Sequence, residues 1–560
     1  MSLNESSKVF IGIHEGHVDP AVAVVKNGKL IAYSEEERHI RYKHAKNIYP
    51  AEALKYCLNV ANVTLEDVDA IAVNWNLPAY NDGTMKRFYE SMEKNWNIDK
   101  TTANWQKSEL QRYDHVNFKN HHEAHWRNLF GDMKFPQICS MPHHYVHAFQ
   151  ACMQSPFDKS LCLTVDGSGD QHCTALWQHE GNKIEPIREI IMPHSLGWLY
   201  AAFTEYLGFE AYDGEYKVMG LAAYGKPNSI LRDKLGKIIF PSPDNIEYSI
   251  DPAYIHYGIH TYSQRFTDKL VELLGRKPRL SQENITDWHH DVAFAVQEKL
   301  EESVVRLIRW GIQKTGNGNI CFGGGVGLNV KLNSRIFQLP EVNDMFAHPL
   351  CSDSGAAAGA AFAASHKFTE IVPEKLKTLA VGHEETNESI EKTLKLASLE
   401  YKKASDICDE IAEQLAKGKI VGWFQGRMEA GPRALGQRSI LCDPRFIENR
   451  DKVNEIIKYR EYWRPFCPAI VEEAAEQYFD KCTNAPFMTI SFQANEKLKE
   501  KTPAIVHIDG SCRVQMVNKE RLPLFHKLLT AFEKRTGVPV LLNTSFNIKG
   551  EPVVCTIQDA

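Results

Sequence analysis

Residues 161–170 read L-C-L-T-V-D-G-S-G-D, and residues 173–187 that follow read C-T-A-L-W-Q-H-E-G-N-K-I-E-P-I. The first part has the apolar run of a buried strand that ends in a polar loop, and the second part has the pattern of a hairpin. The same plan occurs from Val9, where V-F-I-G-I precedes A-V-A-V-V-K-N-G-K-L-I-A-Y with Asn27-Gly28 at the turn. Two such units in one chain predict an internally duplicated α/β fold.

A third segment indicates a nucleotide site. Residues 291–314 have apolar side chains at helical spacing, and Gly316 follows as the expected C-cap. The run N-I-C-F-G-G-G-V-G-L-N from Asn319 then predicts a short strand that ends in glycines. Glycines at a strand end allow backbone N–H groups to face a nucleotide, although a tight connection is the commoner role of such a turn.

The duplicated units and the glycine turn resemble the actin-like ATPase superfamily. The resemblance implies that the fold is a duplicated actin-like (ASKHA) ATPase domain. It also implies ATP with Mg²⁺ as a ligand and a nucleotide-binding set of Gly167, Gly169, Lys217, Gly323, Gly324, Gly325 and Asn329. For Lys217, in G-E-Y-K-V-M-G, a structural salt bridge is the alternative to a phosphate contact.

The composition is that of a globular protein with more than one domain. The chain has 560 residues, of which 43% are hydrophobic and 24% are charged. A net charge of −6 disfavours a nucleic-acid partner. The 13 cysteines form no C-x-x-C pair, and no apolar run is long enough to span a bilayer. We expect reduced thiols and a cytoplasmic protein without a membrane partner.

The domain boundaries follow from a change in composition. A helix of small residues begins near Ala356 and is expected to close the first domain, and residues 371–387 become polar and rich in Glu, Lys and Pro. We therefore predict a first domain over residues 1–370, a linker over 371–387 and a smaller α/β domain over 388–560.

An arginine cluster dominates the predicted second domain. Residues 426–439, G-R-M-E-A-G-P-R-A-L-G-Q-R-S, place Arg427, Arg433 and Arg438 among glycines with Glu429 between them. Guanidinium groups suit phosphate and carboxylate oxygens, and glycines permit close approach of the backbone to an anion. The alternative is a solvated charged surface, but the regular Gly and Pro positions favour a shaped pocket.

Three motifs of this region closely resemble the NodU/CmcH-type O-carbamoyltransferases. They are residues 426–439, the run Y-R-E-Y-W-R-P-F from Tyr459, and L-N-T-S-F-N-I-K-G-E-P, which ends at Pro552. The resemblance implies a YrdC-like C-terminal domain that makes carbamoyl adenylate from carbamoyl phosphate and ATP. It also implies that the anions are held by Arg427, Arg433, Arg438, Ser439, Lys458, Arg464, Arg513, Asn543 and Ser545.

Two H-x-x-x-H pairs compete as metal ligands, His121 with His125 and His143 with His147. On a helix, either pair would place two imidazoles on one face. The first pair lies in a very polar region and is interpreted as surface decoration. The second pair precedes a strand that ends at Asp166, and we therefore favour it.

The order H-x-x-x-H, D-G-x-G and a late S-D-x-G is similar to the carbamoyltransferase family, whose N-terminal domain resembles the ATPase that makes threonylcarbamoyladenosine. The resemblance implies that His143, His147, Asp166 and Asp353 bind one divalent metal, iron(II). Two nitrogen and two carboxylate ligands also suit zinc or manganese.

The transfer step needs a base near the acceptor hydroxyl. His17 and Asp19, in H-E-G-H-V-D-P-A, are predicted to fill this role, and Arg433 is the third predicted catalytic residue. Asp19 is alternatively a turn residue before Pro20. The resemblance implies that the acceptor is a small molecule such as an antibiotic or a sugar. Residues 78–136, rich in aromatic groups, either line its pocket or pack in the core. The family resemblance also implies a homodimer.

Three other functions compete with O-carbamoyl transfer. A tRNA threonylcarbamoyladenosine-type enzyme would share both domain resemblances, but the chain has no basic stripe. A metal-dependent hydrolase would leave the arginine cluster unexplained. A non-catalytic actin-like ATP-binding module would ignore the C-terminal motifs.

Overall fold

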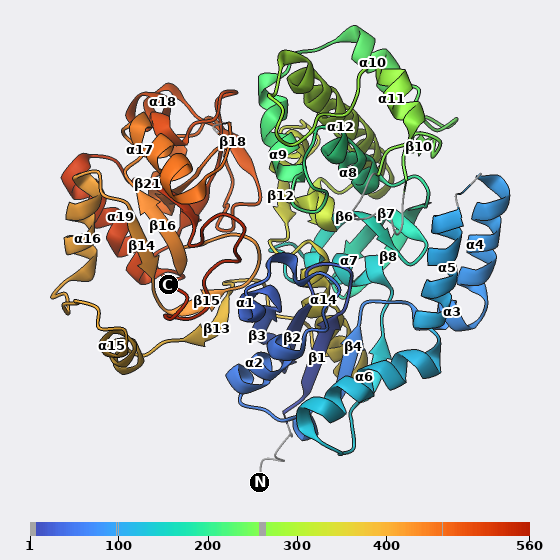
Figure 1. Ribbon diagram of the computed structural model, residues 1–560, viewed down its shortest axis with the longest axis horizontal. Helices are drawn as coiled ribbons and strands as arrows, with labels where there is room; N and C mark the ends of the chain where they lie inside the picture. Colours follow the sequence, from blue (N-terminus) through green and yellow to red (C-terminus); the bar gives the residue numbers. More distant parts are fainter. Residues whose placement is uncertain (1–6, 97, 99, 257–264, 462) are drawn as a thin grey trace. The chain divides into compact units, whose positions relative to one another are not determined.

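The computed structural model describes residues 7–96, 98, 100–256, 265–461 and 463–560 (Figure 1). By internal contacts the chain divides into two compact units. The first contains the residues before Glu15, together with Val22–Leu30 and Asn62–Lys375, and the second contains Glu15–Ala21, Ile31–Ala61 and Leu376–Ala560. No helix among the described residues combines the length and the apolar character that a membrane span requires.

Two five-stranded sheets repeat one topology. The first has the order β3-β2-β1-β4-β5, and the second, taken from its other edge, has the order β8-β7-β6-β11-β12. In both, the central strand is followed along the chain by a hairpin on one side and by two parallel strands on the other. The strands of the first sheet are β1 (Val9–His14), β2 (Ala21–Lys26), β3 (Lys29–Glu35), β4 (Ala70–Val73) and β5 (Gln137–Ser140). Those of the second are β6 (Lys159–Gly169), β7 (His172–Glu180), β8 (Lys183–Ile191), β11 (Asn319–Gly323) and β12 (Asp344–Ala347).

This repetition confirms the predicted internally duplicated α/β fold. The first hairpin turns at Asn27 and Gly28, whose φ angles of 50° and 74° are those of a two-residue hairpin turn. The predicted helix is α12 (Asp287–Thr315), and it ends at Gly316 with a φ of 69°. A C-cap in this left-handed region favours glycine because no Cβ is present to clash.

Helices α7 (His143–Met153) and α14 (Asp353–Thr369) pack closely against the strands and against each other. A Cβ on Gly12 of β1 would lie 1.7 Å from the carbonyl oxygen of Ala357, and one on Gly359 would lie 2.6 Å from that of Val146. The small residues of α14 therefore permit close approach of both neighbours. The two helices position three of the four candidate metal ligands.

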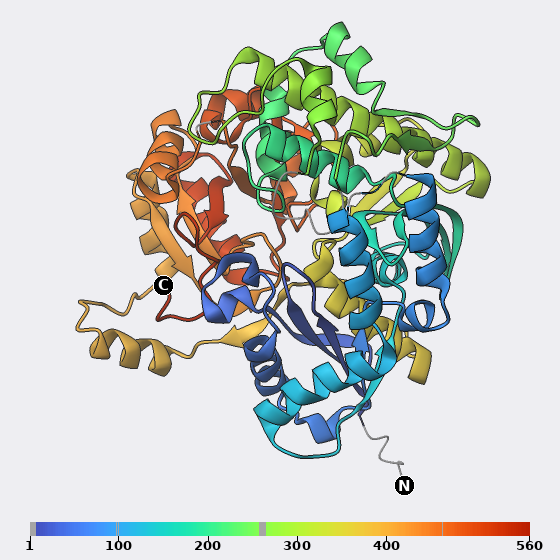
Figure 2. The same cartoon turned by 45° about the vertical axis from the view of Figure 1, so that its right-hand side comes forward.

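The segment between β4 and β5 is helical. It contains α3 (Leu77–Asn81), α4 (Thr84–Asn95), α5 (Lys100–Arg112) and α6 (His115–Phe130), and α4 and α5 lie side by side in Figures 1 and 2. The other elements of the first unit are α8 (Leu196–Tyr206), α9 (Glu215–Leu221), α10 (Ser229–Leu235), β9 (Ile239–Pro241), β10 (Tyr248–Ile250), α11 (Asp268–Leu274) and α13 (Val330–Phe337).

The second unit is built on a mixed sheet of order β14-β16-β21-β17-β20. Its strands are β14 (Val421–Phe424), β16 (Arg438–Cys442), β17 (Cys467–Val471), β20 (Gln515–Val517) and β21 (Val540–Ser545). Two-stranded pairs join β13 (Ala380–Glu384) with β15 (Arg427–Glu429), and β18 (Ser491–Gln493) with β19 (Ser511–Arg513). The helices are α1 (Glu37–Ile40), α2 (Ala51–Ala61), α15 (Asn387–Leu396), α16 (Ile407–Ala416), α17 (Ile447–Lys452), α18 (Glu496–Lys501) and α19 (Pro523–Thr536). The second unit is an α/β unit, but its bounds differ from the predicted domain over 388–560, because it also contains Glu15–Ala21 and Ile31–Ala61 and begins its last segment at Leu376. The strand β13 lies within the segment expected as a linker.

Candidate functional site

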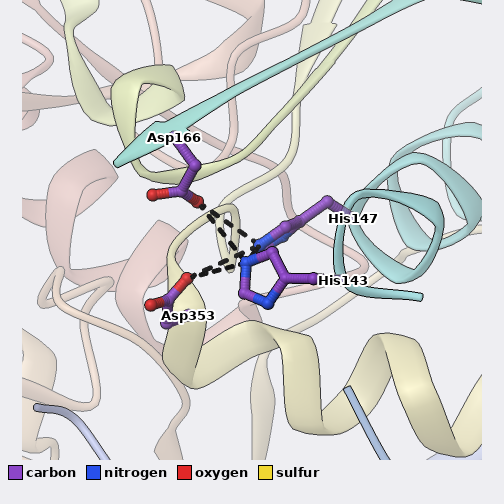
Figure 3. A group of neighbouring side chains, drawn as sticks. All are labelled: His143, His147, Asp166 and Asp353. Atoms are coloured by element: carbon purple, nitrogen blue, oxygen red, sulfur yellow. Dashed lines mark hydrogen bonds and ion pairs between the residues drawn. The ribbon is translucent and has the colours of Figure 1, made fainter. Parts of the chain in front are cut away.

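Four side chains from three elements converge in the first unit (Figure 3). His143 and His147 lie one turn apart on α7, Asp166 lies near the end of β6, and Asp353 is the first residue of α14. The spacing i, i+4 places both imidazoles on one face of α7. The helix dipole favours a carboxylate at the N-terminus of α14.

The donor atoms of this cluster lie at distances suited to one shared cation. The two histidine Nε2 atoms are 3.1 Å apart, and they lie 3.3 and 3.6 Å from Asp353 Oδ1. Asp166 Oδ2 lies 3.4 Å from His147 Nε2 and 4.0 Å from His143 Nε2. Ligands bound at about 2.0–2.2 Å from a zinc-like ion are roughly 3–3.5 Å from one another.

The two carboxylates of the cluster favour a positive charge beside them. Burial disfavours the imidazolium of His143, but hydrogen bonds that it donates to Asp166 and Asp353 outweigh burial and raise its pKa to about 10. Burial would raise the pKa of Asp353, but His143 and His147 hold it well below its usual range. Asp353 Oδ1 faces both imidazole Nε2 atoms. Two carboxylates with two neutral imidazoles therefore fit a divalent cation.

Neighbouring groups fix the orientation of His143. Its Nδ1 lies 3.1 Å from the side-chain amide of Asn74, and its backbone N–H donates to Asp170 Oδ2 at 3.1 Å. A Cβ on Gly169 would lie 2.2 Å from the ring, so only glycine permits this approach. Such outer contacts orient metal-ligating histidines in known sites.

Asp166 also connects the two glycine turns. Its Oδ1 accepts the N–H of Gly167 at 2.7 Å and its Oδ2 accepts the N–H of Gly325 at 2.9 Å. Gly324 has a φ of 83°, and a Cβ there would lie 2.3 Å from the Val165 carbonyl oxygen. The predicted nucleotide loop, Gly323 to Gly325, thus lies against the end of β6, beside the metal cluster.

Two other predicted nucleotide residues are held by protein groups. Asn329 caps α13 through the N–H of Leu332, and its carboxamide exchanges hydrogen bonds with Gln297. Lys217 lies on α9 with Nζ 5.7 Å from the centre of the Phe209 ring. Neither contact tests the nucleotide-binding predictions.

The competing histidine pair and the predicted base are placed as follows. His121 and His125 lie on α6 with ring centroids 4.8 Å apart, and within the described ranges no third ligand completes a metal group with them.

His17 Nδ1 lies 3.1 Å from Asn47 Oδ1. Asp19 Oδ1 lies 2.8 Å from His44 Nδ1, and Asp19 adopts a φ of 52°. His17 and Asp19 therefore have separate partners, and their catalytic role stays a prediction.

Strand pairing brings three predicted anion-binding residues together in the second unit. Ser439 of β16 pairs with Ser545 of β21, and Asn543 of β21 pairs with Leu441 on one side and Cys467 on the other. The Asn543 amide donates to Ala434 O at 3.2 Å. These side chains thus gather beside the loop between β15 and β16, which carries Arg433.

Glu429 shapes this loop from inside. Its Oε1 accepts backbone N–H groups of Leu435, Gln437 and Arg438 at 2.9, 3.3 and 3.0 Å. Glu429 is only 1% exposed, so these bonds are made in a low dielectric, where a charged acceptor is strong. The Glu429 carboxylate therefore holds the loop. Sequence analysis noted Glu429 between the arginines but predicted no role for it.

Arg438 is buried with hydrogen-bonding capacity left over. Its Nη1 donates to the carbonyls of Gln425, Gly426 and Gln437, and its guanidinium lies 3.6 Å from the centre of the Phe424 ring. Its Nε and Nη2 are buried and have no hydrogen-bond partner among the described residues. A buried guanidinium with unused N–H groups suits an anion.

Lys458 and Arg427 are held by oxygen atoms of the protein. Lys458 Nζ donates to Ser545 O at 2.5 Å and to Asn547 Oδ1 at 2.6 Å. Burial, followed by the charges of Arg460 and Arg464, lowers its pKa to about 6. The Arg427 guanidinium donates to three backbone carbonyls, those of Ile31, Val381 and Gly382.

The remaining predicted anion ligands also have local contacts. Arg513 Nε donates to Cys467 Sγ at 2.9 Å, and Arg464 lies 3.7 Å from Glu461. All 13 cysteines are unpaired thiols, as expected from their spacing.

Comparison with known proteins identifies the family of this chain. A sequence profile described as "Carbamoyltransferase N-terminus" matches residues 9–362, and one described as "Carbamoyltransferase C-terminus" matches residues 412–560. The chain belongs to the carbamoyltransferase family. It is therefore a transferase, as the C-terminal motifs predicted.

Two relatives in sequence support this assignment. Nodulation protein NolNO of Sinorhizobium fredii is 34% identical over 97% of this chain and 76% of its own length. Nodulation protein NolO of Bradyrhizobium diazoefficiens is 35% identical over 75% of each chain. Among solved structures, component A of the (R)-2-hydroxyglutaryl-CoA dehydratase of Acidaminococcus fermentans aligns with a TM-score of 0.35 and 13% identity, over 64% of this chain and 98% of that one.

Several supporting residues could not be predicted from the sequence. Asn74 lies 69 positions before His143, and no motif links them. Asn547 lies two positions after Ser545 in the run N-T-S-F-N. This closeness in sequence is the signal that could have identified Asn547 as a supporting residue. Arg38, which donates to the Gly431 carbonyl at 2.7 Å, is 393 positions from its partner.

Proposed function

We propose that this carbamoyltransferase uses ATP and carbamoyl phosphate to carbamoylate a hydroxyl group of a small molecule, through carbamoyl adenylate. The observation that carries this proposal is Arg438, buried with unused N–H groups beside Ser439, Ser545 and Asn543. ATP and carbamoyl phosphate are both anions, and the charge that develops on their phosphate groups during reaction needs preorganised cations of this kind.

The second unit is proposed to make the adenylate. Water cleaves carbamoyl phosphate to carbamate and phosphate, and a carbamate oxygen then attacks the α-phosphorus of ATP. The bond to the β-phosphate oxygen breaks and pyrophosphate leaves. Arg433, Arg438, Arg464 and Arg513 would hold the phosphate oxygens, and Lys458 would contribute a point charge when protonated. A pocket poor in water would protect carbamate from loss.

The first unit is proposed to use the adenylate. His143, His147, Asp166 and Asp353 would hold a divalent metal, iron(II) by family resemblance, whose contribution is Lewis acidity. The N–H groups of Gly167 and Gly325 donate to Asp166 and would fix this carboxylate as a metal ligand. The acceptor oxygen attacks the carbamoyl carbon, AMP leaves, and a general base takes the hydroxyl proton. His17 and Asp19, the candidates for this base from the sequence, belong to the second unit.

The donor reaction can be tested before the acceptor is known. A phosphorus NMR time course with ATP, Mg²⁺ and carbamoyl phosphate should show pyrophosphate, and omission of carbamoyl phosphate should abolish it. Arg438→Ala should lower the rate at least about 100-fold, since it removes a buried charged donor. Pyrophosphate formed equally without carbamoyl phosphate would contradict the proposal.

A further inference from the structure

A buried hydrogen-bond chain lies behind the metal cluster and ends at His14. Asn74 Nδ2 lies 3.1 Å from His143 Nδ1, and Asn74 Oδ1 lies 3.2 Å from His14 Nδ1. All three residues are 0% exposed. A buried polar group is costly without a partner, so the donors and acceptors along this chain have to agree with one another.

The register of two strands places Asn74 beside His14. Strands β1 and β4 are parallel neighbours in which Ile13 lies opposite Val73, so the next residue of each follows at the same edge of the sheet. Every residue of both strands is buried. A shift of the register by one residue would turn these side chains to the other face, and the buried strands therefore specify the pair.

The residues that follow β4 hold the ring of His143 from two further directions. The centres of the Trp75 and His143 rings are 5.2 Å apart. Asn76 donates its backbone N–H to Asp170 Oδ1 at 2.9 Å, and Asp170 Oδ2 accepts the backbone N–H of His143 at 3.1 Å. These contacts place the imidazole, but they do not decide which of its nitrogens carries the proton. That choice depends on the hydrogen bond at Nδ1.

Cation binding by His143 requires one direction of this hydrogen bond. A neutral imidazole that binds a cation through Nε2 carries its proton on Nδ1, and Nδ1 is then a donor. The group opposite has to accept, and the Asn74 carboxamide accepts only through Oδ1. Because Oδ1 lies toward His14 and Nδ2 toward His143, the carboxamide needs half a turn. The two ends of a carboxamide are nearly equal in size, so the turn leaves the packing unchanged.

The same half turn reverses the hydrogen bond between Asn74 and His14. Before the turn, His14 Nδ1 donates to Oδ1. After the turn, Nδ2 donates to His14 Nδ1, so the proton of His14 lies on Nε2. The chain therefore has two consistent directions. Only the second direction is compatible with a cation on His143 Nε2, and occupancy of the cluster thereby changes the hydrogen bonding of His14.

We propose that Asn74 is a positioning residue for the metal ligand His143 and that its carboxamide makes this half turn when the cation binds. His14 is the partner that completes the chain in both directions. The inference rests on the proposed function, in which the four residues of Figure 3 hold a divalent metal. Histidine ligands of known sites are oriented by an acceptor at their second nitrogen, and loss of that acceptor weakens metal binding about 10–100-fold.

A cobalt titration of the full chain tests the positioning role without an activity assay. After removal of bound metal with a chelator, Co²⁺ binding is followed by its visible absorption. Leucine and aspartate are both close to asparagine in size, but only aspartate accepts a hydrogen bond. Asn74→Leu should weaken Co²⁺ binding at least about tenfold. Asn74→Asp should bind Co²⁺ at least as tightly as the unsubstituted chain, because either carboxylate oxygen accepts from His143 Nδ1.

The order of the two variants separates positioning from packing. A side chain that only fills space would give the reverse order, because leucine packs well in a core and a buried carboxylate is costly. The matched control is Asn228→Leu, at the N-cap of α10 in the same unit, which should leave Co²⁺ binding unchanged. His147→Ala should weaken Co²⁺ binding at least about tenfold, which shows that the signal comes from the cluster.

Nitrogen NMR of the chain labelled with ¹⁵N-histidine tests the half turn itself. The His14 signals are identified by their loss in His14→Gln. On addition of Zn²⁺, the His14 Nδ1 signal should change from that of a protonated nitrogen to that of an unprotonated one, and in Asn74→Leu it should not change. A role in packing alone would leave the His14 signal the same with and without Zn²⁺.

Three results would overturn the inference: Co²⁺ binding as tight in Asn74→Leu as in the unsubstituted chain, weaker binding in Asn74→Asp than in Asn74→Leu, or a His14 signal that is the same with and without Zn²⁺. Thermal unfolding establishes that each variant is folded, and the His14 signal of the unsubstituted chain decides if the Asn74 variants do not fold. Failure of the unsubstituted chain to bind Co²⁺, or binding that survives His147→Ala, would overturn the metal site of the proposed function together with this inference.

Discussion

At the scale of single residues, the candidate metal cluster places two carboxylates and two imidazoles together in a buried environment. Asp166 and Asp353 face His143 and His147 at 3.3 to 4.0 Å, and His143 is fully buried. Without a cation, a proton on His143 must balance the carboxylates, and its raised pKa reflects this balance. A divalent ion would provide the charge directly and release that proton.

Substitution of one ligand should therefore remove the metal. We expect His147→Ala to reduce bound iron, zinc or manganese, measured by elemental analysis of the purified protein, by at least about tenfold, since three ligands hold a metal much less tightly than four. The matched control is His125→Ala on α6, which should retain the metal. Equal metal content in both variants would show that the cluster is not the site.

Lys458 makes the donor reaction sensitive to pH. Burial, followed by the charges of Arg460 and Arg464, favours the amine and lowers the pKa of Lys458 to about 6. The ammonium is present below pH 6 and is lost as the pH rises through this value. The KM for carbamoyl phosphate should therefore rise by roughly tenfold between pH 5.5 and 7.5.

The control for this titration is Lys458→Met, in which the pH dependence of KM should be absent and KM should be high throughout. Steady-state pyrophosphate release at a series of pH values measures both proteins. A KM that is flat with pH in the unsubstituted chain would show that Lys458 does not contribute charge to binding.

At the scale of elements, the loop between β15 and β16 depends on Glu429. One carboxylate oxygen holds three backbone N–H groups and thereby sets the course of the chain into β16, where Arg438 and Ser439 lie. Gly431 in the same loop donates its N–H to Glu35 Oε1 at 3.0 Å.

Removal of this carboxylate should destabilise the second unit. Glu429→Ala leaves buried N–H groups unpaired and should cost about 2–4 kcal/mol of unfolding free energy in urea. Glu429→Gln retains a carbonyl oxygen and should cost less than half of that. A loss of pyrophosphate release in the alanine variant should accompany the lost stability, and equal stability of the two variants would contradict this role.

At the scale of the whole molecule, the second compact unit is discontinuous in sequence. It includes Ile31–Ala61, whose Arg38 and Arg41 donate to carbonyls of Gly431, Pro552 and Val553. Arg38 is 2% exposed, so its bonds belong to the interior of the unit. The C-terminal residues are therefore not a self-contained folding unit.

A chain of residues 376–560 alone should accordingly lack fixed tertiary packing. We expect weak near-UV circular dichroism and a broad urea transition, because Gly431 and Val553 lose buried partners. Addition of a peptide of residues 31–61 should sharpen the transition, and the same peptide with Arg38→Ala should do so much less. A cooperative transition of the fragment alone, at the midpoint of the full chain, would show that the segment is dispensable.

Much of the fold could be predicted from local pattern. Strand, hairpin and helix signals near Val9, Leu161 and Asp287 repeat, and repetition of alternating and helical apolar spacing is a property of the sequence alone. The H-x-x-x-H spacing and the three C-terminal motifs likewise specified the family and the candidate residues, because each is short and contiguous.

Tertiary structure alone decided what surrounds those residues. Asn74 beside His143, His14 beside Asn74 and Arg38 beside Gly431 join segments far apart along the chain. Such contacts arise from packing of whole elements, and no local propensity encodes them. The sequence by itself determined the family, the duplicated fold and the donor atoms available for a metal; which groups orient those atoms followed only from how the sheets and helices pack.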